Sequence, residues 1–149
     1  MKPLFRSLMF LAVLLAAMPV LAQKPMPAEA RAAKTIAILN DTKSGEVSAG
    51  AQEQLQRWGH FTVVDDADSA DIVLRFDKKT DRERSNKQST DDKGTTTYSG
   101  SVTFSSQVHM RAYLKGSDTP FYSTETGDSK KKAGITCVTS FERAWLEGR

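Results

Sequence analysis

The feature that constrains this chain most is a strict two-residue alternation along residues 98–114, YSGSVTFSSQVHMRAYL. Only an extended strand directs alternate residues to opposite faces, so the alternation predicts a sheet with one apolar and one polar face. The run is longer than a usual strand of ~5–6 residues, which predicts either one long bent strand or two strands divided near residue 105. Its bulky aliphatic side chains and its phenylalanine all occupy even positions, namely Val102, Phe104, Val108, Met110 and Leu114.

The other periodic segments predict an order of β–α–β–β–loop–β–β–α. A stripe at helical spacing runs from Val47 to Trp58, and Gly59 follows it as a helix-ending residue. Extended patterns mark 35–40, 61–64, 71–78 and 121–126, and a second helical pattern covers 129–146. We therefore expect a single α/β domain over 35–149, with a mixed, mainly antiparallel sheet of about five strands and two helices packed on one face.

Residues 79–97 interrupt these patterns. The segment contains no large apolar side chain, and 81–94 carry four positive and four negative charges. A segment of this composition buries too little surface to offset the entropy of ordering it. We therefore predict a mobile loop at 79–97, placed between two strands.

The amino terminus has the three parts of a secretory signal peptide. Lys2 and Arg6 make a basic start, residues 8–17 are apolar, and Ala22 ends a cleavage-site pattern. The apolar run is shorter than the ~20 residues of a membrane span, so we expect cleavage and no stable membrane insertion afterwards. Gln23 follows the predicted cut in place of the cysteine that lipid attachment requires. For a bacterial source, this predicts a periplasmic or secreted protein without a lipid anchor, and we interpret residues 23–34 as a flexible lead-in.

The charge balance limits the classes of binding partner, and the cysteine count limits the possible disulfides. The full chain has a formal charge of +3, and removal of residues 1–22 takes away two cations, which leaves a nearly balanced protein. Such a chain lacks the concentrated positive field of a nucleic-acid-binding protein, so we expect no nucleic-acid partner. The single cysteine, Cys137, has no partner for a disulfide within the chain. A buried, unreactive thiol and a bridge between two chains both remain open.

Three segments carry a resemblance to a known group of proteins. TIAILND at 35–41, WGHFTVVDDADSADIV at 58–73 and the strand pair at 108–127 are similar to small exported α/β domains of the bacterial envelope. This group includes the amino-terminal domain of the TolB translocation protein and the curli-secretion lipoprotein. The chain departs from them by lacking a propeller and a lipidated cysteine. The resemblance covers about residues 35–146 and implies a fold and an envelope setting, but no functional residue transfers.

Catalytic and metal-binding motifs are not evident. His60 and His109 are the only histidines, and neither stands at a metal-ligand spacing. The acidic cluster at 65–71 lacks the glycine and the terminal glutamate of a calcium loop. No Gly-x-Ser-x-Gly or phosphate-binding glycine pattern occurs. We therefore expect no catalytic residue, no cofactor and no metal.

The polar face of the predicted sheet is the remaining candidate for function. If both helices cover the even face, the odd face meets solvent or a partner. The residues that we select for a binding face are Arg75, Thr103, Gln107, His109 and Arg111. Our first hypothesis is a non-catalytic envelope protein that binds another protein or an envelope polymer. The alternatives are a small-ligand carrier, with a pocket between sheet and helices near Trp58 and Trp145, and a small hydrolase that uses Ser101 or His109.

Overall fold

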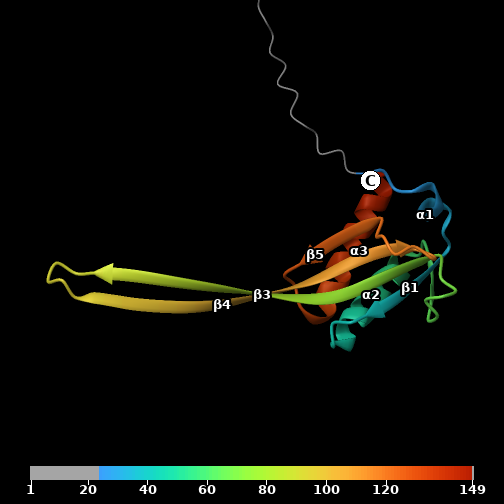
Figure 1. Cartoon of the computed structure of the whole chain (residues 1–149). Helices are drawn as coiled ribbons and strands as arrows, with labels where there is room; N and C mark the ends of the chain where they lie inside the picture. Colours follow the sequence, from blue (N-terminus) through green and yellow to red (C-terminus); the bar gives the residue numbers. More distant parts are fainter. Residues whose placement is uncertain (1–23, 149) are drawn as a thin grey trace, which may run out of the picture.

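A five-stranded sheet carries its two long helices on one face, and two of its strands continue outward as a projecting hairpin (Figure 1). The computed structural model describes residues 24–148, so the predicted signal peptide at residues 1–22 lies outside the described residues. The elements are α1 (Ala28–Ala32), β1 (Thr35–Asn40), α2 (Gly45–Trp58), β2 (Thr62–Val64), β3 (Ile72–Thr90), β4 (Thr96–Leu114), β5 (Tyr122–Thr126) and α3 (Lys130–Glu147).

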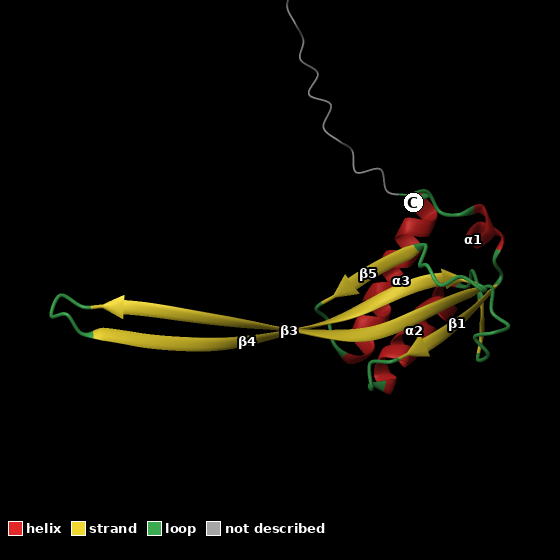
Figure 2. Ribbon diagram, in the orientation of Figure 1, coloured by secondary structure: helices red, strands yellow, loops and turns green. Residues whose placement is uncertain are grey.

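The sheet is mixed, as predicted. Its spatial order is β2-β1-β3-β4-β5. β1 pairs in parallel with β2 and with β3, whereas β4 pairs antiparallel with both β3 and β5. Figure 2 shows α2 and α3 behind the same face of this sheet, which confirms the predicted α/β class with two helices on one face.

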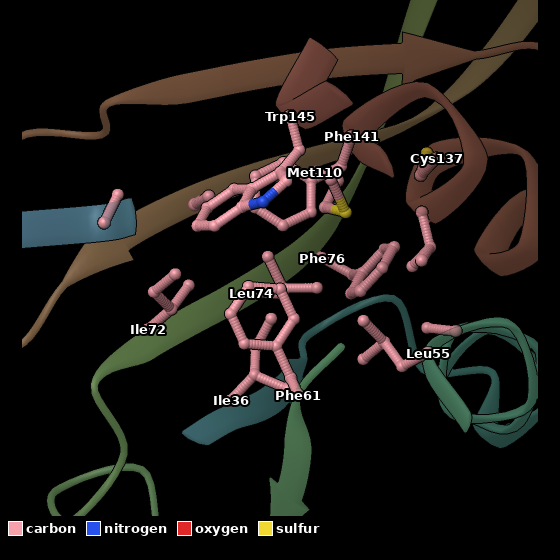
Figure 3. Close-up of a cluster of buried hydrophobic side chains, with 14 of the residues drawn as sticks. Ile36, Leu55, Phe61, Ile72, Leu74, Phe76, Met110, Cys137, Phe141 and Trp145 are labelled. Carbon is pink, nitrogen blue, oxygen red and sulfur yellow. The ribbon is translucent and has the colours of Figure 1, made fainter. Parts of the chain in front are cut away.

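The core forms where even-numbered side chains of the central strands meet the two long helices (Figure 3). Opposite residues in the register share a face, so Ile72, Leu74 and Phe76 of β3 point the same way as Met110 and Ala112 of β4. All five are fully buried. Burial of a large side chain of this kind contributes about 1.5–3 kcal/mol. From the two long helices, the buried hydrophobic partners are Val47, Ala51, Leu55, Ala133, Cys137, Val138, Phe141 and Trp145.

The two long helices approach each other backbone to backbone at two glycines. A Cβ atom added at Gly134 of α3 would overlap the carbonyl oxygen of Val47 and lie 2.6 Å from the amide nitrogen of Ala51. A Cβ at Gly50 of α2 would overlap the carbonyl group of Lys131. Gly134, which weakens a helix by its own propensity, is therefore required by packing.

The prediction of a mobile loop at 79–97 is wrong, because most of this segment forms strand. Residues 79–90 belong to β3, residues 96–97 belong to β4, and only 91–95 form the turn. The register runs without interruption from Ile72↔Leu114 to Thr90↔Thr96, so β4 is one long strand and is not divided near residue 105. Backbone pairing with β4 supplies the order that the side chains of 79–90 could not supply by themselves.

The lead-in before β1 is also more ordered than expected. Residues 28–32 form α1, and Met26, Ala30 and Ala33 are buried in the core. The Arg31 guanidinium donates a hydrogen bond of 3.5 Å to the carbonyl oxygen of Trp145 in α3. The burial of three apolar side chains and the hydrogen bond of Arg31 therefore both dock this segment on the domain.

The contact between the helices generates the first prediction. Gly134→Ala should lower the free energy of unfolding by about 1–3 kcal/mol, because the new methyl group must push α2 and α3 apart. Gly45→Ala is the matched control, since a Cβ at Gly45 meets nothing within 4 Å. Urea denaturation followed by circular dichroism measures both. Equal stability of the two variants would show that the helices do not meet at these glycines.

A second prediction concerns the Asp71 carboxylate, which joins the starts of β1 and β3. It accepts hydrogen bonds from the Lys34 and Thr35 amides at 2.9 and 3.0 Å, and these bonds lower the pKa of Asp71. A lowered carboxyl pKa contributes stability above the unfolded-state value of 3.8, and the contribution is lost as the pH falls through the folded-state value.

Asp71→Asn should therefore be less stable than wild type at neutral pH, and this difference should shrink as the pH is lowered below the unfolded-state pKa. Urea midpoints across the acidic range test this, with Asp65→Asn as a control for loss of one carboxylate. A difference that stays constant with pH would mean that the charge of Asp71 does not stabilise the fold.

Candidate docking surface

The outer part of the β3–β4 hairpin, residues 78–90 and 96–107, extends well beyond the helices; we call it the distal hairpin (Figure 1). Thirteen extended residues span about 43 Å at ~3.3 Å per residue. β1 pairs with β3 no further than Phe76, and β5 pairs with β4 no further than Val108. A two-stranded hairpin is marginally stable by itself, so this segment depends on the sheet to which it is continuous.

The distal hairpin ends in a turn that the sequence encodes. The Asp91 carboxylate accepts hydrogen bonds from the Lys93 and Thr95 amides at 3.1 and 2.8 Å. Gly94 follows with φ of 78°, a left-handed conformation that favours glycine. Asp-Asp-Lys-Gly at 91–94 was therefore a readable hairpin signal inside the segment that we predicted as a loop.

The even face of the distal hairpin combines exposed apolar groups with cations. Phe104 is 65% exposed, Tyr98 76% and Val102 41%. Arg82 lies directly opposite Phe104 in the register, and its guanidinium carbon is 5.8 Å from the centre of the Phe104 ring. The charged residues on this face are Lys78, Arg82 and Arg84, whereas Asp81 and Glu83 belong to the odd face.

This arrangement revises the sequence interpretation of the even positions. The prediction placed Val102 and Phe104 in the core together with Met110, and the structure places all three on one face. Met110 is buried, but the helices do not reach Val102 or Phe104. The alternation of even and odd positions correctly identified which side chains share a face of the sheet. It could not reveal where along β4 the helices stop covering that face.

On the odd face of the sheet, two of the predicted binding residues are paired with acidic neighbours. Arg75 donates from Nε to the Asp41 carboxylate at 2.8 Å, and Arg111 donates from Nη1 to the Asp77 carboxylate at 2.6 Å. Arg75 and Arg111 are directly opposite each other in the β3–β4 register. An open hollow of about 580 Å³ on this face is lined by residues that include Leu39, Val73, Arg75 and Tyr113.

The other three predicted residues continue along β4 on the same face. His109 lies opposite Asp77, Gln107 opposite Lys79 and Thr103 opposite Glu83. His109 Nε2 is 3.5 Å from the Glu125 carboxylate, but it makes no hydrogen bond there. The structure thus gathers Arg75, His109 and Arg111 over the body of the sheet and leaves Gln107 and Thr103 on the distal hairpin.

The geometry bears on the two alternative functions. The hydrolase alternative named Ser101 or His109, and these residues lie on one strand eight residues apart, about 26 Å, so the structure does not bring them together as a nucleophile and its base. The space near Trp58 and Trp145 is filled by packed rings, including Phe61 and Phe141 at 5.1–6.1 Å between centroids. Among residues 24–148, no group of three or more His, Cys, Asp or Glu side chains is placed to hold a metal ion.

Comparisons with known proteins give no family assignment. No family model and no curated protein matches the chain. A PDZ domain protein from Parabacteroides distasonis is similar in structure with a TM-score of 0.42 and 12% identity, over 79% of this chain and 33% of its own length. The rare lipoprotein B from Shewanella oneidensis has a TM-score of 0.37 and 17% identity, over 76% of this chain and 92% of its own.

This chain therefore spans about a third of the PDZ domain protein. Both of these similar proteins are bacterial. Neither of the two is a TolB or curli-secretion protein. Within the described part of the chain, no helix has the length and apolar character needed to cross a membrane.

Cys137 generates a prediction about chemical reactivity. The residue is 1% exposed in α3, and burial raises the pKa of its thiol to about 12. Because the thiolate is the reactive form, the native protein at about pH 8 should react with Ellman's reagent on the order of 10³-fold more slowly than protein unfolded in guanidinium chloride. Equal rates in the two states, or a dimer linked through Cys137, would contradict a buried thiol.

Proposed function

We propose that this protein is a non-catalytic binding module of the bacterial envelope, periplasmic or secreted and without a lipid anchor. In this proposal the signal sequence at residues 1–22 exports the chain and is then removed. The partner is another protein or an envelope polymer, and the chain uses no cofactor, metal or nucleic acid. The observation that carries the proposal is the exposure of Tyr98, Val102 and Phe104 on the distal hairpin.

The distal hairpin is well suited to a docking role for a thermodynamic reason. Large apolar side chains that remain in water forgo the stabilisation of burial, and large exposed aromatic groups on a projecting segment mark interaction sites. Phe104 and Tyr98 do not contribute to the core, because the two long helices do not extend over this part of β4. A partner that covers the even face would bury these rings and would also stabilise the paired strands.

Charge indicates the chemistry of that partner. The even face of the distal hairpin presents Lys78, Arg82 and Arg84 and no acidic side chain. A partner surface that combines acidic and apolar groups would be complementary in charge and in polarity. Acidic protein surfaces and anionic envelope polymers both meet this description.

The odd face offers the second docking surface of the proposal. Arg75, Gln107, His109 and Arg111 lie there, with Thr103 further along the same face. Because Asp41 and Asp77 already neutralise Arg75 and Arg111, an anionic partner would have to compete with those carboxylates. The even face of the distal hairpin carries no such competing acids, which makes it the stronger of the two surfaces.

Crosslinking in living bacteria, followed by capture of the tagged chain, tests the proposal and separates the two faces. Tyr98→Ser with Phe104→Ser removes the rings of the even face, and Arg75→Ala with Arg111→Ala removes the cations of the odd face. Asp65→Asn, at an exposed position directly after β2, is the control.

We expect the even-face variant to lose its crosslinked envelope partner at least tenfold while its circular dichroism spectrum remains native. Loss of the crosslinked partner in the odd-face variant alone would show that the docking surface lies at Arg75 and Arg111. Capture that is unchanged in both variants would overturn the binding proposal.

A further inference from the structure

The outer edge of β4 is open along the distal hairpin. β5 pairs with Val108–Ala112 only, so among residues 24–148 no strand pairs with 96–107 on the side away from β3. The Ala112 carbonyl accepts from Phe121 on the β5 side, whereas the Thr95 carbonyl accepts from Asp91 on the β3 side. Because the register is uninterrupted, even-numbered residues from 96 to 106 direct their N–H and C=O groups to the open edge.

The two strands of the distal hairpin differ sharply in charge. β3 carries seven charged side chains between 78 and 90, and such charges on an edge strand resist pairing with another chain. The same stretch of β4, TTYSGSVTFSSQ at 96–107, has no charged residue and no proline. Threonine, valine, tyrosine and phenylalanine also favour extended structure, so the β4 edge has the chemistry of a strand that accepts a neighbour. The charged residues of β3 are Lys78, Lys79, Asp81, Arg82, Glu83, Arg84 and Lys87.

We propose that the neighbour is a second copy of this chain, paired antiparallel through β4 about a two-fold axis at Ser101. In this register Tyr98 of each copy lies opposite Phe104 of the other, and Val102 lies opposite Gly100. Both aromatic pairs fall on the same even face, where cross-strand aromatic contacts are favourable. The small Gly100 leaves room for the two rings and for Val102.

Other antiparallel registers between the two β4 strands do not place Tyr98 opposite Phe104. An axis at Gly100 would place Phe104 opposite Thr96, and an axis at Val102 would place Tyr98 opposite Ser106. An axis between two residues would set even positions opposite odd ones, which the pleat of a sheet forbids. Only the axis at Ser101 pairs both aromatic side chains with each other.

Backbone geometry and charge agree with this axis. Even residues supply the hydrogen bonds at the open edge, so Ser101 faces Ser101 as a non-hydrogen-bonded pair with Cα atoms ~4.5 Å apart. The two β3 strands form the outer edges of the four-stranded sheet. The two β3 strands are therefore three strand spacings apart, so Arg82 and Arg84 of one copy lie at least about 14 Å from those of the other, which limits their repulsion.

Cysteine crosslinking of the purified chain tests the axis directly. Ser101→Cys should form a disulfide-linked dimer with oxidised glutathione, which takes up the two electrons and two protons of the thiols, because the expected Cα separation suits a disulfide. Ser85→Cys is the matched control, since Ser85 is paired with Ser101 on β3 and lies away from the axis. Native Cys137 is buried in both variants.

We expect Ser101→Cys to crosslink at least tenfold faster than Ser85→Cys. Equal rates, or faster crosslinking of Ser85→Cys, would overturn the proposed axis.

Sedimentation of the unmodified chain provides the second measurement. It should show a concentration-dependent monomer–dimer equilibrium, and Phe104→Lys should weaken dimer formation at least tenfold without changing the urea midpoint of the body. Gln88→Lys, on β3 opposite Tyr98, adds the same charge away from the open edge and should leave the dimer intact.

A chain that remains monomeric at every concentration would overturn the pairing and leave the edge for a strand of a different protein. The inference goes beyond the proposed function, and it is tested without any envelope partner. Its failure would therefore leave the binding proposal unaffected.

Discussion

The register between β3 and β4 is the constraint on which the rest of the structure depends. The strands pair residue for residue from Ile72↔Leu114 at the body to Thr90↔Thr96 at the tip. A shift of one residue would move every side chain to the opposite face. Burial of Phe76 and Met110 therefore determines, over a distance of many residues, that Phe104 and Tyr98 share the even face of the distal hairpin.

The helical layer explains where that face stops being core. α2 and α3 meet at Gly50 and Gly134, where the backbones are too close to admit a side chain. This contact holds both helices together on the even face of the body, and neither of these two long helices covers the odd face. The distal hairpin extends past the end of this helical layer. The apolar side chains on the even face of β4 are therefore buried at Met110 but exposed at Phe104.

The candidate surfaces were only partly predictable from the sequence. Alternation identified the odd positions, and the structure places Arg75 opposite Arg111 and His109 opposite Asp77 on that face. The alternation could not reveal that Asp41 and Asp77 pair with the two arginines, because these contacts join residues 34 positions apart. Arg82 and Arg84 were missed entirely, since residues 79–90 have no apolar periodicity and are extended only through backbone pairing with β4.

The sequence by itself determined the local elements: an alternating run at 98–114 and a helical pattern at 47–58 that ends at Gly59. These follow from periods of two and 3.6 residues and from the left-handed geometry that glycine permits. Tertiary structure alone decided the length of the hairpin, the docking of α1 through Ala30, and the exposure of Phe104. Each of these outcomes depends on which segment, distant in the sequence, lies alongside. The local sequence pattern does not specify that neighbour.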